Sequence, residues 1–450
     1  MMELAMTNLF HPVRGTVSAL MRRSSWFRDT ALGWTNAVHR RVPVWDSPAN
    51  ASRLGEAGSR RLLQQCFRRK PRGGDPVPGL IPYSLQGASS YANPYPAYAA
   101  LREHAPVCFD PVGSCWLVMR HDLVTAALRR PEAFSDEYSA AFDPFLAGSS
   151  PSQHVLFRQA VSPVFSSFEP AAIEAFARAW MEGFLSRTRA SGRFEVVRDL
   201  SVPLPRAFTA HLLGLTEAET ASVVRALSPN RTEMTAVLEA VGKVLSAVLD
   251  DIEKQPRPGL CSQWIHAPEA ERLPRLAILH LVRHLWFAGT ATLSMLIPSA
   301  LVLGFRNPEA MAAVRSNPSR MPSFLSEVLR LESPTQWVPR KAVAAIKLDG
   351  VPIPAGALVK FHLASANRDP ARFPDPDVLR LERPPHAHLA FGVGGHFCLG
   401  AAIARTLASV ALEGVLTAFP RLKWMEDPNA LTYESSELFR ALRRVPLEVG

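Results

Sequence analysis

The sequence predicts a mainly α-helical fold with a minor β region, of the α+β class, over residues 79–450. Segments with apolar residues at helical spacing carry this prediction, and they lie near residues 170–187, 206–225, 233–254, 274–297, 308–315 and 322–331. Strand signals concentrate around residues 342–365. With 450 residues and 47% hydrophobic content the chain can bury a large core. We expect residues 79–450 to form a single domain.

The first 78 residues differ in composition from the rest. They carry thirteen Arg and Lys against five Asp and Glu, so they hold +8 of the formal net charge of +10. The body of the chain is therefore close to neutral, which argues against a nucleic-acid partner. The segment lacks sustained periodicity and ends in the breaker-rich run 70–78. We expect a poorly ordered extension; an organelle transit sequence, a membrane-surface segment and an over-long start that contains Met21 are alternatives.

Cysteine usage and hydropathy bear on the compartment. The five cysteines are odd in number, widely spaced and free of CxxC pairs, which indicates neither a disulfide framework nor a zinc ribbon. This favours a reducing compartment, and we expect a cytoplasmic protein. The most apolar windows, near 276–305, are broken by Arg283, His284 and Pro298, so we expect no transmembrane span.

Local signals place the smaller elements. Proline in the first turn favours a helix over 95–102, and residues 115–119 are typical of a strand. Four apolar residues, Ile346, Leu348, Val351 and Ile353, flank the pair Asp349-Gly350. Such a pair between alternating apolar residues predicts a β-hairpin.

The run Phe391-Gly392-Val393-Gly394-Gly395-His396-Phe397-Cys398-Leu399-Gly400 is the strongest chemical signal in the chain. An apolar helical stripe follows Cys398, which places this cysteine at a helix N-terminus. The helix dipole and unpaired N–H groups there favour a thiolate, and glycines let the backbone approach a flat ligand. His396 and Arg405 add positive charge, suited to anionic groups such as haem propionates.

Three alternative roles for this run fit its residues less well. A dinucleotide fingerprint needs a glycine where Phe397 stands. A cysteine hydrolase needs a distant histidine and a third orienting group, for which nothing distinctive appears. A buried structural cysteine leaves the glycines unexplained. A metal-bound cysteine beside a haem accounts best for all of these residues.

The ten residues from Phe391 to Gly400 match the FGxGxHxCxG signature, and the chain thereby resembles the cytochrome P450 superfamily. The runs 93–96, 366–370 and 388–392 resemble its soluble bacterial branch. The resemblance implies a P450-like fold with haem b, iron protoporphyrin IX, between a long distal helix and the helix after the cysteine. Cys398 would be the axial ligand to iron, and Phe391 and Gly392 would contact the cofactor.

Glu327 and Arg330 stand three residues apart in an otherwise apolar helix. An exposed pair of this kind is the commoner case in general and contributes little. The resemblance instead implies a buried ExxR pair that is completed by a third residue before the cysteine run, with Arg380 or Arg383 as candidates.

The resemblance also implies a basic set for the haem propionates. Arg340 stands at the head of the strand-rich segment, where the family places such an arginine. His154 and Arg158 have i,i+4 spacing, and His396 is the fourth member. Each alone could be an ordinary surface or packing residue.

Residues 288–293 align with the family's oxygen-side motif, with one departure. Ala288 and Gly289 would let the helix pass close over the haem, and Thr292 would supply the catalytic hydroxyl. The acid that normally precedes this threonine is Ala291. A usual member of the proton relay is therefore missing.

Two classes of chemistry follow from the resemblance. The first is an O2-dependent monooxygenase that acts on a small hydrophobic, natural-product-like substrate, with electrons from NADPH or NADH through a ferredoxin or flavodoxin-type donor. The second is catalysis without the usual relay, such as nitric oxide reduction, radical coupling, isomerisation or peroxygenation. A non-catalytic haem sensor is a third class. Trp337, Val338 and Leu285 are candidates for an apolar substrate pocket, or equally for ordinary core.

His280 and His284 also show i,i+4 spacing, as a helical zinc pair would. No third ligand or acid accompanies them in an HExxH-like pattern, so we expect ordinary packing there.

Overall fold

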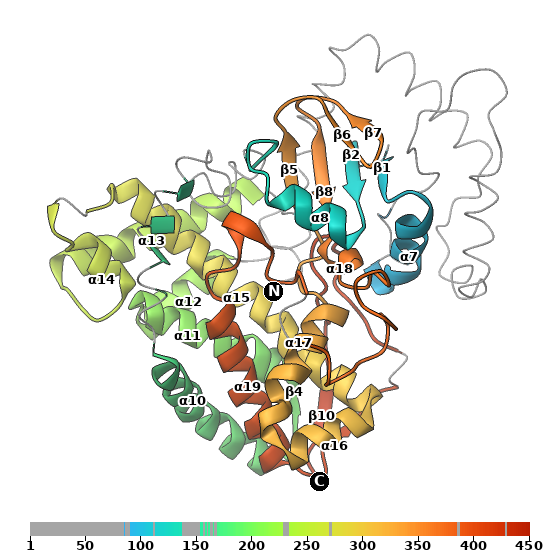
Figure 1. Ribbon diagram of the computed structural model, residues 1–450. Helices are drawn as coiled ribbons and strands as arrows, with labels where there is room; N and C mark the ends of the chain where they lie inside the picture. Colours follow the sequence, from blue (N-terminus) through green and yellow to red (C-terminus); the bar gives the residue numbers. More distant parts are fainter. Residues whose placement is uncertain are drawn as a thin grey trace.

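The fold is described from a computed structural model of the chain (Figure 1). The described residues are 85, 91–110, 113–136, 154–155, 158–159, 161–162, 165, 169–227, 234–269, 272–384, 388–427 and 430–450. The predicted extension over residues 1–78 lies outside them, and its order stays a prediction.

Helices dominate, as the sequence predicts. The α-helices are α7 (Tyr95–His104), α8 (His121–Leu128), α10 (Pro170–Ser191), α11 (Pro203–Leu213), α12 (Glu217–Ala226), α13 (Met234–Lys254), α14 (Leu260–Ile265), α15 (Arg275–Arg306), α16 (Pro308–Ser316), α17 (Met321–Leu331), α18 (Leu363–Ala366) and α19 (Ala401–Ala418). Short π or 3-10 segments are η2 (Val196–Ser201), η4 (Pro318–Arg320) and η5 (Gly394–His396). The mainly α architecture with a small β region is confirmed.

The main sheet and the hairpin of β6 (Ile346–Leu348) and β7 (Val351–Ile353) lie at one end of the molecule (Figure 1). In contrast, β4 (Arg193–Glu195) and β10 (Pro446–Glu448) of a second sheet lie among the helices near the C-terminus (Figure 1). The main sheet has the order β1-β2-β8-β5-β3, built from β1 (Val107–Asp110), β2 (Cys115–Val118), β8 (Leu358–Phe361), β5 (Val338–Ala342) and β3 (Phe134–Ser135). The strands β4, β10 and β9 (Lys423–Trp424) form the second sheet. All neighbours pair antiparallel except β2 and β8, which are parallel.

The predicted hairpin is present as β6 (Ile346–Leu348) and β7 (Val351–Ile353). Asp349 and Gly350 join the two strands with φ values of 48° and 82°. Positive φ at both central turn residues matches the right-handed strand twist, and Asp and Gly tolerate it better than most residues.

Two predicted helix boundaries are wrong. The segment 206–225 is not one helix, because Gly214 ends α11 with φ 80° and Thr216 begins α12 with a capping box that Glu219 completes. The segment 274–297 does not stop at Pro298. It continues as α15 to Arg306, because Pro298 and the residues around it are buried among other helices, whose packing outweighs the missing N–H.

Helix α15 is the central element of the helical half (Figure 1). Its first half packs in one buried cluster with α13 and α14, through residues such as Leu281, Trp286 and Trp264. Its second half packs in another with α10, α17 and α19, through residues such as Ile297 and Leu407. The long helix therefore has a fixed position relative to α19, the helix that follows Cys398.

Within the part of the chain that the structure describes, α15 and α19 are the two helices long and apolar enough to cross a membrane by length and composition alone. Arg283, His284 and Pro298, which were expected from the sequence to interrupt the apolar stretch, therefore do not make α15 too short or too polar to span a membrane. However, 61% of its apolar window and 44% of the α19 window are buried in the protein, as in the core helices of many globular proteins.

Candidate functional site

Cys398 lies at the start of α19, as predicted. Its backbone N–H donates to the Phe391 carbonyl oxygen at 2.9 Å, and Gly400 is the N-cap of the helix. Cys398 is exposed, whereas the other described cysteines, Cys108, Cys115 and Cys261, are buried. Among the described cysteines this one alone can meet a bound group.

The electrostatics of the thiol differ from the sequence-based expectation. Desolvation by the protein atoms around the sulfur raises the pKa of the Cys398 thiol, although the side chain is open to solvent, and the Gly400 N–H and the charges of Arg158 and Arg405 lower it. The thiol form is therefore favoured in the absence of a bound group. A bound metal ion deprotonates a coordinating thiol and would supply the missing stabilisation.

The glycines of the loop have identifiable conformational roles. Gly392 and Gly394 adopt φ of 72° and 76°, which favours glycine over other residues. A Cβ on Gly394 would lie 3.0 Å from the Leu128 carbonyl oxygen, at the end of α8. The Phe391 ring lies under the Arg405 guanidinium, 4.5 Å from the ring centroid, and so ties the loop to α19.

The structure brings the four predicted basic residues to one side of the cysteine loop. The His154 and His396 rings stack with centroids 3.7 Å apart. Arg158 Nη1 donates to the Phe397 carbonyl oxygen at 2.9 Å. Burial, followed by the charges of His396 and Arg158, lowers the pKa of His154 to about 4. His154 is therefore neutral at pH 7, and its contact within this set is the ring stack with His396.

A carboxylate that sequence reasoning missed holds this basic set together. Asp136 Oδ1 lies 2.6 Å from Arg340 Nε, and its Oδ2 forms a close ion pair with His396 Nε2. Strands β3 and β5 pair antiparallel, with Phe134 opposite Ala342 and Ser135 opposite Lys341. Continuing this register by one residue places Asp136 opposite Arg340, which explains the contact. The two-residue strand β3 gives no periodic signal, so this register could not be found from sequence.

On α15 the small residues interrupt an otherwise buried helix. Ala288 is exposed and Thr292 is half-buried, whereas Trp286 and Leu293 on either side are buried. Thr292 Oγ1 donates to the Ala288 carbonyl oxygen at 3.1 Å. A Cβ on Gly289 would lie 2.6 Å from Thr209 Oγ1, so Gly289 is required for contact with α11. Its predicted closeness to a cofactor stays a prediction.

The Glu327–Arg330 pair is buried, as the ExxR resemblance implies. Arg330 Nε and Nη2 donate to Glu327 at 2.6 and 2.9 Å, and both side chains are at most 4% exposed. Of the two candidate third residues, Arg383 contributes its side chain, with Nε 3.2 Å from Glu327 Oε2. Arg380 contributes its backbone N–H at 3.0 Å, and its side chain pairs with Asp375 at the surface.

The histidine pair at 280 and 284 shows no metal geometry. His280 Nδ1 accepts from Arg283 Nη2 at 2.7 Å. Within the part of the chain that the structure describes, no three His, Cys, Asp or Glu side chains gather as a metal site.

The donor set fits a haem. One exposed thiol stands at a helix N-terminus, and two arginines and two histidines, side chain types that pair with carboxylates in proteins, lie beside its loop. Phe397, in the cysteine loop, and Ala288, on α15, are exposed and add apolar surface for a flat ring.

Comparison with known proteins decides the family. A family profile described as Cytochrome P450 matches residues 248–440. Cytochrome P450 monooxygenase PikC of Streptomyces venezuelae is 30% identical over 405 residues, which cover 85% of this chain and 97% of that protein. The chain belongs to the cytochrome P450 family.

Further P450 relatives agree over nearly their whole length. The 6-deoxyerythronolide B hydroxylase of Saccharopolyspora erythraea is 28% identical, with 81% of this chain and 98% of that protein covered. The solved structure of cytochrome P450 CYP109Q5 from Chondromyces apiculatus superposes with a TM-score of 0.73 at 29% identity, over 80% of this chain and 95% of that one. The P450 is a haem-thiolate monooxygenase that uses O2 and a small substrate.

Proposed function

We propose that this P450 oxidises a small hydrophobic, natural-product-like substrate, with electrons from NADPH or NADH delivered by a ferredoxin or flavodoxin-type protein in the cytoplasm. The observation that carries the proposal is the exposed Cys398 thiol at the start of α19, beside the basic set. The substrate class rests on the relatives, among them the vitamin D(3) 25-hydroxylase of Pseudonocardia autotrophica and HmtN, a hydroxylase involved in himastatin biosynthesis.

Each residue of the site has a proposed task. Cys398 would hold the iron, and Phe391 and Gly392 shape the loop that carries it. Arg340, Arg158, His396 and His154 would bind the propionates, and Asp136 orients Arg340 and His396. Ala288 is exposed on α15, and Gly289 lets this helix pack closely on α11. The Thr292 hydroxyl can exchange its bond to Ala288 for one to water or substrate. When bound, the haem supplies the activation of O2, with the thiolate as electron donor to iron.

The electron donor is proposed to dock on the face that carries the cysteine loop. Arg129 and Arg130 are exposed at the end of α8, which packs against Gly394 of the loop. Arg158 and Arg405 are near enough to Cys398 to lower the pKa of its thiol. A basic face of this kind steers an acidic partner protein, and the association rate should fall as salt is added.

One observation favours a second candidate. Ala291 stands where the family usually has an acid, and its methyl side chain, which carries no proton, packs with Phe439 against Met295 and Ala441. Nitric oxide reduction is therefore the alternative, with radical coupling, isomerisation, peroxygenation and a sensor role as other chemistries that could do without this acid.

Two measurements test the proposal. Reduced, haem-loaded protein with carbon monoxide should absorb at the Soret position characteristic of the family, and Cys398→His should lose that band while it retains haem. Next, substrate oxidation should require O2 and the electron donor. Rapid consumption of nitric oxide with NADH and no donor protein would instead establish the reductase. A spectral screen of hydrophobic compounds, macrolides and steroids included, would identify the substrate class.

A further inference from the structure

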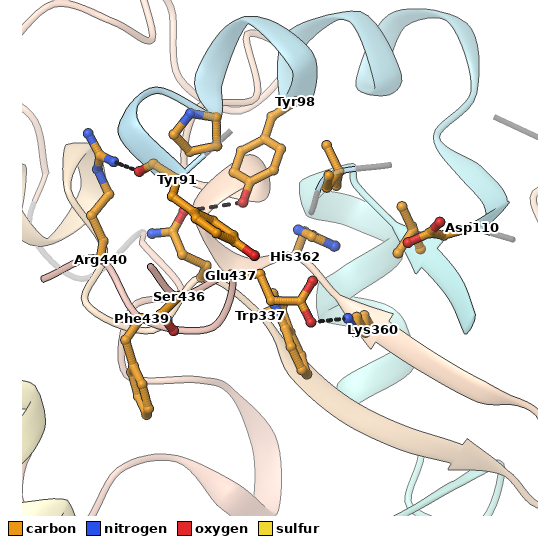
Figure 2. A pocket seen from close by; sticks show the side chains of 14 residues that line it. Tyr91, Tyr98, Asp110, Trp337, Lys360, His362, Ser436, Glu437, Phe439 and Arg440 are labelled. Atoms are coloured by element: carbon orange, nitrogen blue, oxygen red, sulfur yellow. Dashed lines mark hydrogen bonds and ion pairs between the residues drawn. The ribbon is translucent and has the colours of Figure 1, made fainter. Parts of the chain in front are cut away.

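Two pockets in the described part of the chain differ greatly in size. The first lies between α7, the main sheet and the C-terminal segment, and charged side chains such as Lys360 and Glu437 line it (Figure 2). The space that water can occupy there is about 20 Å³, which is too little for an organic ligand. The second has a volume of about 910 Å³ and opens to solvent. A pocket of that volume can hold an organic molecule.

The larger pocket is bounded by the end of α10, by β4 and η2, and by the C-terminal segment around β9 and β10. We call it the arginine groove, because four arginines are among the residues that line it: Arg187, Arg193, Arg198 and Arg444. Its lining includes neither the cysteine loop nor the basic set beside that loop. A ligand in the arginine groove would therefore be separate from the proposed haem site.

Aromatic side chains line one part of the arginine groove. The Trp180 and Phe184 rings stack along α10, with centroids 6.0 Å apart and 12° between their planes. Phe184 in turn meets Phe194 of β4 edge to face, with centroids 5.2 Å apart. Phe184 and Phe194 are buried, whereas Trp180 is half-buried and Met425, which also lines the groove, is 51% exposed. The indole and the thioether offer apolar contact to a planar molecule.

The two carboxylates of the arginine groove are already bound to protein groups. Glu195 accepts hydrogen bonds from the backbone N–H groups of Val197, Arg198 and Val445, at 3.0, 2.6 and 2.7 Å. Asp199 accepts one from the Glu195 backbone N–H at 2.8 Å and pairs with the Arg198 guanidinium, with 2.6 Å between Nε and Oδ1. Both acids thus hold η2 in place, and among the four arginines they form an ion pair only with Arg198.

Two of the arginines, Arg187 and Arg193, are exposed and form no ion pair within the ranges that the structure describes. The Arg187 side chain turns back along α10, so that a Cβ on Gly183 would lie 3.3 Å from its Nη1. Glu448 stands opposite Arg193 in the register of β4 and β10 but does not pair with it. Because residues 79–450 are close to neutral as a whole, two unpaired arginines beside an aromatic surface are a local feature.

We propose that the arginine groove binds a planar aromatic anion, a carboxylate or a sulfonate, with its ring against Trp180 and Met425 and its charge at Arg187 and Arg193. Guanidinium groups bind such planar or forked anions with two parallel hydrogen bonds, and they stay charged at any pH that the protein tolerates. The ring gains apolar contact that a small inorganic anion would lack. This site is independent of the proposed oxidation of substrate, so either can fail without the other.

The test is a calorimetric titration of the haem-loaded protein with naphthalenesulfonate, with the haem absorption recorded in parallel. One molecule should bind per chain without a change in the haem spectrum, and added salt should weaken the binding. Arg187→Gln and Arg193→Gln should each weaken it by roughly 5- to 20-fold, because each removes a charged hydrogen-bond donor. Trp180→Leu should weaken it by roughly 3- to 10-fold through the lost ring contact.

The matched control is Arg189→Gln, because Arg189 is also an exposed arginine of α10 but does not line the groove. Its affinity should equal that of the wild type, and thermal unfolding should show that all variants remain folded. The proposal is wrong if no saturable binding occurs, or if Arg187→Gln and Arg193→Gln bind as tightly as the wild type. An equal loss in Arg189→Gln would also overturn it, because the anion would then respond only to overall charge.

Discussion

Asp136 and Arg340 form an ion pair between β3 and β5, with 2.6 Å between Oδ1 and Nε. Both side chains are at most 10% exposed, and the same carboxylate pairs with His396, two residues before Cys398. One acidic side chain therefore positions two of the groups proposed to bind the haem propionates.

Asp136→Ala should destabilise the haem-free protein more than the haem-loaded protein. Without haem, the variant leaves the Arg340 guanidinium buried and unpaired, which costs about 3–5 kcal/mol. With haem, a propionate can replace the carboxylate, so the loss should be smaller. Urea unfolding of both forms measures the difference, with Asp136→Asn as the isosteric control. Equal losses in the two forms would show that Arg340 does not serve the propionates.

Substitutions around Glu327 should show that the Arg383 side chain stabilises the protein more than the Arg380 side chain does. Glu327→Ala leaves buried Arg330 without its carboxylate, and the free energy of unfolding should fall by about 3–5 kcal/mol. Arg383→Ala should lose less, because Arg330 still satisfies Glu327. Arg380→Ala removes only an exposed pair with Asp375, for an expected loss of about 0–1 kcal/mol. A larger loss for Arg380 than for Arg383 in urea unfolding would contradict the geometry.

These residues show what the sequence could and could not predict. The helices, the hairpin at Asp349-Gly350 and the Cys398 loop follow from local patterns, because periodicity, turn chemistry and a ten-residue signature are all contained in short segments. Asp136 and Thr209 escaped notice because their roles arise from contacts between segments far apart in the chain. Of the three candidates for an apolar substrate pocket, Trp337 is buried under the Lys360 ammonium group, Val338 packs on the core of the main sheet and Leu285 lies in the helical core.

Gly289→Ala should destabilise the protein through α11. The new Cβ would lie 2.6 Å from Thr209 Oγ1, in a buried contact that cannot relax freely, so a loss of about 1–3 kcal/mol is expected. Thr209→Ala in the same chain should recover most of it. Gly242→Ala in α13 is the control, because nothing lies within 4 Å of its Cβ position. That change should stabilise the helix by about 0.5–1 kcal/mol, and thermal unfolding measures all three variants.

The buried His362 side chain should make the free energy of unfolding depend on pH. Its pKa falls from about 6.5 in the unfolded chain to about 3 in the folded protein, so the unfolded state binds the extra proton first. The contribution of His362 to the free energy of unfolding is fully present above pH 6.5. It decreases as the pH falls toward 3, by at most about 1.4 kcal/mol per pH unit. His362→Phe should remove this contribution, so the wild type minus variant difference in unfolding free energy should decrease in acid. A constant difference between pH 7 and pH 4.5 would contradict the burial of a neutral ring.

Ala291→Asp tests whether the acid that is missing before Thr292 limits the supply of protons. Residue 291 packs against Met295 and Ala441, so a carboxylate there should cost about 1–3 kcal/mol in stability. The variant should oxidise substrate faster and release less hydrogen peroxide per NADPH consumed, because a proton donor then stands next to Thr292. The isosteric control is Ala291→Asn, which carries no proton and should keep the wild-type rate. The assay uses haem-loaded protein with NADPH, ferredoxin and reductase, and equal rates for Ala291→Asp and Ala291→Asn would show that the missing acid does not limit turnover.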